Sequence, residues 1–223
     1  MKRALVLAEG DTEERFIKEV LRDYFWKLGL DLAPTLLTTK RVKSGGSFRG
    51  GVTSFGKFEN DALRLLGSSG GALVTTMLDY YGLPSDFPGM LSRPTGDPLT
   101  RVLHVEAAIK EHFGGRQDFL PYLSLHEFEA LLFASTDELP KALTTPAKAA
   151  EFAAVRAAFK TPEDINERPG QSPSHRIEAI FPAYRKKFHG PTTVMRIGLA
   201  KLRGECPHFN EWITVLESYA RRS

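Results

Sequence analysis

Short, mainly apolar runs alternate along this chain with segments whose apolar residues recur every three or four positions. The first run, residues 4–8, contains no polar residue, which is typical of a strand covered on both faces. The next segment, residues 12–27, has the spacing of an amphipathic helix, and Gly29 follows it as a helix-ending residue. The alternation continues, with strands expected at residues 30–39, 72–78 and 119–125 and helices at residues 58–66 and 99–113. Strands that alternate with helices predict an α/β fold with a mainly parallel sheet flanked by helices.

The last third of the chain shows helical patterns. Helices are expected at residues 147–159, 174–188 and 206–219, and a turn that enters a short helix at residues 161–166. We therefore expect two parts: an α/β domain at residues 1–140, and a helical C-terminal extension at residues 141–223 that packs on it.

Three of the predicted strands are followed closely by an acidic residue: Glu9, Asp79 and Glu127. The carboxyl ends of parallel strands lie at one edge of a sheet, where open α/β sheets bind ligands, so these side chains can converge. Converging carboxylates repel one another unless a cation neutralises them, and oxygen-only clusters suit Mg²⁺ or Mn²⁺. The alternative is that each carboxylate orders a loop or caps a helix, which we favour for the nearby Glu13 and Glu129.

The turn after the first strand has a pattern typical of a helix start. Gly10 permits a sharp turn, Asp11 is a good N-cap, and Glu14 three residues later completes a capping box. This pattern places Glu9 at the end of a strand and beside the N-terminus of a helix.

Other residues near the strand ends could take part in chemistry. His126 precedes Glu127 and is a candidate general base, or a residue that holds a loop by hydrogen bonds. Tyr80 and Tyr81 could stack on bases or pack in the core. For Cys206 we expect a packed thiol rather than a nucleophile.

Residues 40–57 form a basic, glycine-rich segment without acidic residues, in which Lys43 and Arg49 are the candidate substrate contacts. Lysine and arginine would supply charge to grip a phosphate backbone, and the glycines would allow a close approach. The alternative is a solvated loop. The segment is not a Walker loop, because no Gly-Lys-Ser/Thr follows a suitably spaced glycine.

Composition narrows the class of protein. The 223 residues are 42% hydrophobic and 10% aromatic, as expected for a folded globular protein. The formal net charge of +3 permits a nucleic-acid partner without requiring one. The single cysteine excludes an intrachain disulfide and a cysteine-rich zinc site. No apolar run is long enough to span a membrane, so we expect a soluble cytoplasmic protein with no membrane partner.

The chain also resembles known families. The sequence Glu9-Gly10-Asp11-Thr12-Glu13 after a first strand, with an acidic end on a later strand, resembles the TOPRIM fold of topoisomerases, primases and overcoming-lysogenization-defect nucleases. More closely, the chain resembles a prokaryotic TOPRIM-like family that carries only the label domain of unknown function 4276. The matching segments are residues 9–13, 75–84, 125–130, 161–166, 172–176 and 204–212.

The resemblance implies a Mg²⁺-dependent nuclease-like site. Glu9 takes the place of the TOPRIM glutamate, and Asp79 that of the first acid in the Asp-x-Asp motif. The second motif position is Tyr81 instead of Asp, so the missing ligand is expected from Asp86 or Glu127. Relatives of this kind resemble components of antiviral defence loci, often encoded beside ATPases, which implies an ATPase partner.

These observations lead to one main hypothesis and a rival. In the main hypothesis, Glu9, Asp79 and Glu127 bind Mg²⁺ or Mn²⁺ and, with His126, catalyse phosphodiester hydrolysis in DNA or RNA, while Lys43, Arg49 and Tyr81 contact the substrate. In the rival, the chain is a non-catalytic subunit that binds nucleic acid or an ATPase through a degenerate TOPRIM site. A nucleotide phosphotransferase is a third alternative, and the missing Walker loop counts against it.

Overall fold

The computed structural model describes residues 1–38, 52–165 and 170–222, and its centre is a parallel sheet. The strands are β1 (Lys2–Ala8), β2 (Leu30–Leu36), β3 (Leu73–Asp79), β4 (Phe119–Leu120) and β5 (Leu123–Ser124). Their order is β2-β1-β3-β4, with β5 also paired to β3, and every pair is parallel. The predicted α/β fold with a mainly parallel sheet flanked by helices is therefore confirmed.

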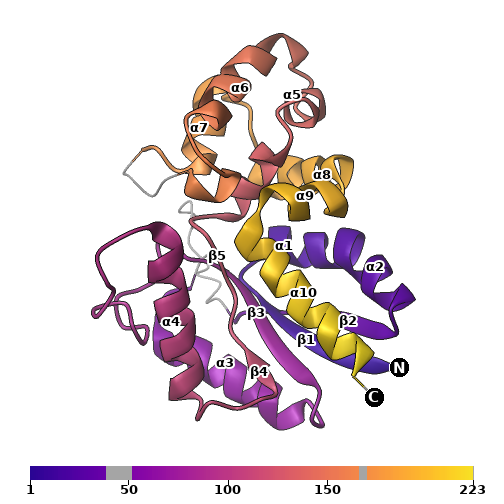
Figure 1. The fold of residues 1–223 in the computed structure, drawn as a ribbon, viewed down its shortest axis with the longest axis vertical. Coiled ribbons are helices and arrows are strands. Elements are labelled where there is room, and N and C mark those ends of the chain that lie inside the picture. The colour runs from indigo at the N-terminus through magenta and orange to yellow at the C-terminus, as the bar shows by residue number, and fades with distance from the viewer. Residues whose placement is uncertain (39–51, 166–169, 223) are drawn as a thin grey trace, which may run out of the picture.

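The two faces of the sheet are buried by different sets of helices (Figure 1). Helices α3 (Phe55–Ser68) and α4 (Pro98–His112) cover one face, while α1 (Asp11–Phe16), α2 (Arg22–Lys27) and α10 (Pro207–Arg221) lie on the other. In β1, Ala4 and Val6 join the core beneath α1, whereas Leu5 and Leu7 join the core beneath α3. Burial on both sides explains why residues 4–8 of β1 are all apolar and why β3 is mainly apolar, with Thr75 and Thr76 buried at its centre.

The C-terminal helices continue the core on the α1 side of the sheet. They are α5 (Glu138–Ala142), α6 (Ala149–Ala157), α7 (Pro173–Ile180), α8 (Lys186–Ile197) and α9 (Leu199–Glu205), followed by α10. Short 3₁₀ helices span Phe128–Ala134, Pro146–Lys148 and Pro162–Asp164. In Figure 1, α5, α6 and α7 lie beyond one end of the sheet, and α10 returns along it. The indole N–H of Trp212 in α10 donates to Thr75 Oγ1 in β3 at 2.9 Å, which fixes this return.

Two predicted elements differ from the structure because each contains a proline. The helix expected at residues 174–188 is two helices, because Pro182 cannot continue a helix and Phe181 before it leaves the helical conformation, with φ −132° and ψ 85°. The strand expected at residues 119–125 is split at Pro121 into β4 and β5.

The start of the first helix also differs from the prediction. Gly10, rather than Asp11, is the N-cap of α1, and no side chain caps the helix, so the predicted capping box is absent. The helix expected at residues 12–27 is present as α1 and α2, joined by a π-helical segment at Ile17–Leu21. Within the described ranges, none of the helices combines the length and the apolar character needed to cross a membrane.

Candidate functional site

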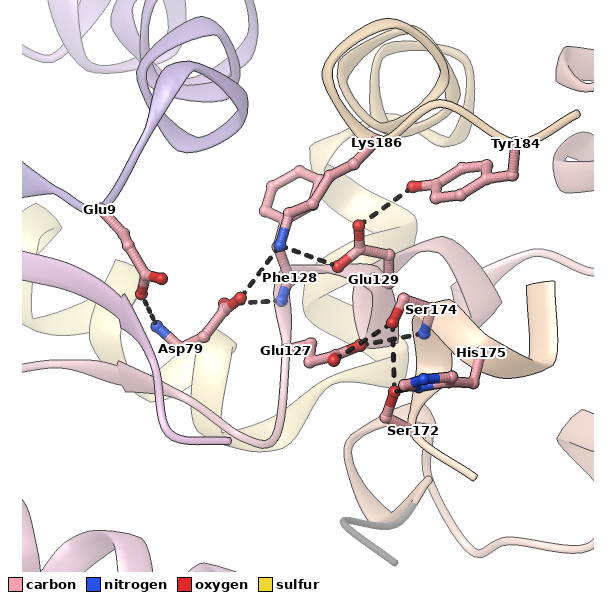
Figure 2. A network of polar contacts seen from close by, with 10 residues as sticks. All are labelled: Glu9, Asp79, Glu127, Phe128, Glu129, Ser172, Ser174, His175, Tyr184 and Lys186. Atoms are coloured by element: carbon pink, nitrogen blue, oxygen red, sulfur yellow. Dashed lines mark hydrogen bonds and ion pairs between the residues drawn. The ribbon is translucent and has the colours of Figure 1, made fainter. Parts of the chain in front are cut away.

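Glu9 and Asp79 meet at the carboxyl ends of the two central strands. Strands β1 and β3 pair in parallel up to Ala8 and Met77, and the Glu9 amide continues the ladder by donating to the Met77 carbonyl at 3.1 Å. Both acidic residues therefore lie at the same sheet edge. The Asp79 amide donates to Glu9 Oε2 at 2.8 Å (Figure 2). The backbone at the end of β3 therefore orients the carboxylate of Glu9, which follows β1.

Glu13 adds a third carboxylate from the first turn of α1. Its side chain is buried, and within residues 1–38, 52–165 and 170–222 the hydrogen bond that its carboxylate accepts comes from its own backbone amide. Burial and the neighbouring Asp79 carboxylate raise the pKa of Glu13 to about 8, and the same two causes raise the pKa of Glu9 well above its ordinary value. These shifts favour the protonated form of both side chains, so a further cation would be needed for the carboxylates to be ionised together.

Lys186 brings one positive charge to this cluster. It is the first residue of α8, and its Nζ lies 3.0 Å from Asp79 Oδ2 and 3.1 Å from Glu129 Oε2. Burial alone would lower the pKa of Lys186, but Asp79, Glu129 and Glu13 raise it well above its ordinary value. Lys186 therefore carries its charge at neutral pH.

Glu129 is fully buried and holds Lys186 from the side opposite Asp79. Its Oε1 accepts a hydrogen bond from the Tyr184 hydroxyl at 3.2 Å. Burial raises the pKa of Glu129 to about 7, although the nearby Lys186 acts in the opposite direction. We call the five residues Glu9, Glu13, Asp79, Glu129 and Lys186 the acidic cluster.

The structure does not bring the Glu127 carboxylate to Glu9. Both oxygens of Glu127 accept hydrogen bonds from Ser174 at the start of α7, at 2.9 Å from its amide and 3.2 Å from its hydroxyl. The Ser174 hydroxyl lies 3.1 Å from that of Ser172, which in turn lies 2.7 Å from His175 Nδ1 (Figure 2). In this arrangement Glu127 orders the junction between β5 and α7.

Of the other predicted site residues, His126, Tyr81 and Asp86 are described by the structure, and each has its own surroundings. His126 is buried with a positive φ of 64°, and its carbonyl accepts the Tyr81 amide at 2.7 Å. The Tyr81 side chain is partly exposed. Asp86 accepts the Phe55 amide at the start of α3, at 2.9 Å, so it serves that helix. Lys43 and Arg49 lie outside the described residues.

Sequence analysis did not place Glu13, Glu129 or Lys186 in the site. Glu13 and Glu129 are expected from sequence to order a loop or cap a helix, and Lys186 falls near the end of the helix expected at residues 174–188. Glu13 follows Glu9 by four residues, a spacing that could have indicated two acids at one strand-to-helix turn. Pro182 could have indicated that Lys186 begins a new helix.

The oxygen atoms of this cluster are suited to one hard divalent cation. Among the described residues, no three His, Cys, Asp or Glu side chains are placed so that they could together hold a metal ion. Mg²⁺, however, is commonly bound by one or two carboxylates, with water and substrate phosphates completing its shell. Within the described ranges no hydrogen bond reaches Glu9 Oε1, and the Glu13 carboxylate is bonded only by its own backbone amide; both side chains carry raised pKa values. Glu9 and Glu13 are therefore the residues that would hold such an ion.

Comparison with known proteins identifies the family. A family model described as domain of unknown function (DUF4276) matches residues 8–217. The chain belongs to this family. The match includes the whole acidic cluster, since it begins one residue before Glu9 and extends beyond Lys186. No curated protein and no solved structure matches the chain. The activity must therefore be argued from the site itself.

Proposed function

We propose that the chain is a divalent-metal-dependent hydrolase of phosphodiester bonds in DNA or RNA, with a TOPRIM-like site and a cytoplasmic location. The observation that carries this proposal is the acidic cluster. Carboxylates from the turn after β1, from α1 and from the end of β3 converge at the sheet edge where α/β folds bind ligands, and those of Glu13 and Asp79 are buried. Lys186 is the one cationic side chain that contacts this group in the described structure. Carboxylates arranged in this way need a further cation.

The TOPRIM resemblance supports the same chemistry. Glu9 follows the first strand, and Asp79 ends the strand paired beside it, as the resemblance implies for the glutamate and the first motif acid. Tyr81 replaces the second motif acid, and Glu13 supplies a carboxylate that this motif lacks. The expected nucleic-acid contacts of Lys43 and Arg49, the ATPase partner and the role in defence remain part of this proposal.

Four members of the cluster have a definable task. Glu9 and Glu13 would hold the ion, which when bound would polarise the phosphodiester and help to activate water. The Asp79 amide holds Glu9 in place, and Lys186 directs a fixed positive charge toward the same edge. In the overall reaction water adds to phosphorus, one P–O ester bond breaks, and the leaving oxygen takes up a proton.

A cleavage assay tests this proposal. Single-stranded and duplex DNA, RNA and tRNA would be incubated with the protein in Mg²⁺, in Mn²⁺ and in EDTA. We expect metal-dependent cleavage that falls at least about a hundredfold in Glu9→Gln and Asp79→Asn, because each removes an acid of the cluster. Asp86→Asn is the matched control, since Asp86 serves the start of α3 and should leave cleavage intact. Cleavage that survives in both cluster variants would contradict the proposal.

Two observations favour a second candidate, a non-catalytic subunit that binds nucleic acid or an ATPase. Tyr81 stands at the second motif position, and Lys186 already neutralises Asp79. This candidate predicts that the protein binds nucleic acid but cleaves none of the four substrates in either metal.

A further inference from the structure

The ammonium group of Lys186 lies where a cation between two carboxylates would be expected. Its Nζ is 3.0 Å from Asp79 Oδ2 and 3.1 Å from Glu129 Oε2. We propose that Lys186 is a built-in cation of this site, so that the acidic cluster takes one divalent ion per chain and not two. This inference rests on the proposed function, because it concerns the cations of the same site.

The carboxylate oxygens divide into two groups. On the side of Lys186, Asp79 Oδ1 accepts the Phe128 amide at 2.8 Å and Asp79 Oδ2 contacts Lys186, while Glu129 uses one oxygen for Tyr184 and the other for Lys186. An ion bound by Asp79 and Glu129 would have to displace the ammonium group.

On the other side of the cluster, oxygens are available. Glu9 uses Oε2 for the Asp79 amide, and its Oε1 accepts no hydrogen bond in the described part of the chain. The buried carboxylate of Glu13 accepts a hydrogen bond from its own backbone amide and from no other residue there. Two carboxylates with available oxygens match the ligand number that Mg²⁺ commonly takes from a protein.

The position of Lys186 is fixed by the helix that carries it. Helix α8 begins at Lys186, and the Arg185 amide donates to His189 Nδ1 at 2.8 Å, which secures the first turn. Gly190 in the next turn lets α8 lie close to its neighbours. A Cβ atom at this position would lie 3.2 Å from Thr12 and 3.3 Å from Phe128.

The neighbouring Lys187 provides a contrast. Its side chain is 77% exposed and pairs with Asp11 on the surface at 2.6 Å. Lys186 and Lys187 are adjacent, have the same chemistry and begin the same helix. They differ in that Lys186 contacts the carboxylates of Asp79 and Glu129, whereas Lys187 contacts neither. Lys187 is therefore a matched control.

Isothermal titration with Mn²⁺ tests the inference on wild type, Lys186→Met and Lys187→Met. We expect one Mn²⁺ per chain in wild type and in Lys187→Met. In Lys186→Met, Asp79 and Glu129 lose their cation, so we expect a second Mn²⁺ or at least about tenfold tighter binding, since a tenfold change needs only about 1.4 kcal/mol. Lys186→Gln serves the same purpose if the methionine variant does not fold.

Each outcome has a defined consequence. Two ions per wild-type chain would overturn the inference without any variant, as would unchanged stoichiometry and affinity in both Lys186 variants. A wild type that binds no ion would overturn the predicted stoichiometry of one and the proposed metal-dependent hydrolysis together, even if Lys186→Met binds one. One bound ion without cleavage would instead leave this inference standing and remove the hydrolysis.

Discussion

Replacing Glu13 by glutamine should stabilise the protein at high pH and change its stability little at low pH. The Glu13 carboxylate is buried, lies near Asp79, and has its pKa raised from 4.5 to about 8. Because the pKa is higher in the folded state, the native protein binds more protons than the unfolded chain between these values. Stability must therefore fall as the pH rises from 4.5 to about 8.

The size of this effect follows from the shift. At about 1.4 kcal/mol per pKa unit, ionisation of Glu13 costs the folded state up to about 5 kcal/mol above pH 8. At about pH 5 the cost is about 1 kcal/mol, because the group is then largely protonated in the native state. Glutamine retains the shape of the protonated acid and carries no charge, so Glu13→Gln avoids the cost at both values.

Urea unfolding of wild type and Glu13→Gln at about pH 5 and about pH 8.5 measures the difference. We expect the advantage of Glu13→Gln to grow by about 4 kcal/mol between the two conditions. The neighbouring Glu14→Gln is the control: Glu14 pairs with Lys18 at 2.7 Å on the surface, so its effect should stay within about 0.5 kcal/mol. An advantage of Glu13→Gln that does not grow with pH would refute the reasoning.

Three further substitutions test how the fold positions the site. Gly190→Ala should lower the free energy of unfolding by about 1–2 kcal/mol and weaken Mn²⁺ binding, because the added Cβ would lie 3.2 Å from Thr12 and 3.3 Å from Phe128. Thermal unfolding and Mn²⁺ titration measure the two effects. Gly204→Ala, at a helical position in α9 with no atom within 4 Å of the added Cβ, should instead stabilise by about 0.5–1 kcal/mol, and a loss would contradict the comparison. Trp212→Phe removes the hydrogen bond to Thr75 and should cost about 1–2 kcal/mol in urea unfolding, whereas no change would show that this bond does not hold α10 on the sheet.

The central sheet was predictable because its strands are buried on both faces. Mainly apolar runs end near Ala8 and Leu78, and the acids that follow, Glu9 and Asp79, meet at one edge. Local sequence is sufficient to predict that these two acids meet, because parallel pairing places the carboxyl ends of neighbouring strands at the same edge of the sheet.

The remaining part of the site depends on tertiary packing. Lys186 reaches Asp79 across 107 positions of sequence, through the approach of α8 that Gly190 permits. Glu13 has the local sequence of a first-turn helix acid, and only the packing around it shows that it is buried rather than solvated. Prolines explain two of the incorrect boundaries, but no local pattern indicates which helix end will meet the sheet.

The thermal stability of wild type and Glu9→Gln with and without Mn²⁺ tests the central claim most directly, namely that the acidic cluster binds a divalent ion. At a hundredfold excess over Kd, binding should stabilise wild type by about 2.7 kcal/mol, which raises Tm by about 5–10 °C for a chain of this size. We predict this shift in wild type and its loss in Glu9→Gln. No shift in wild type at millimolar Mn²⁺, or an equal shift in both proteins, would contradict the account.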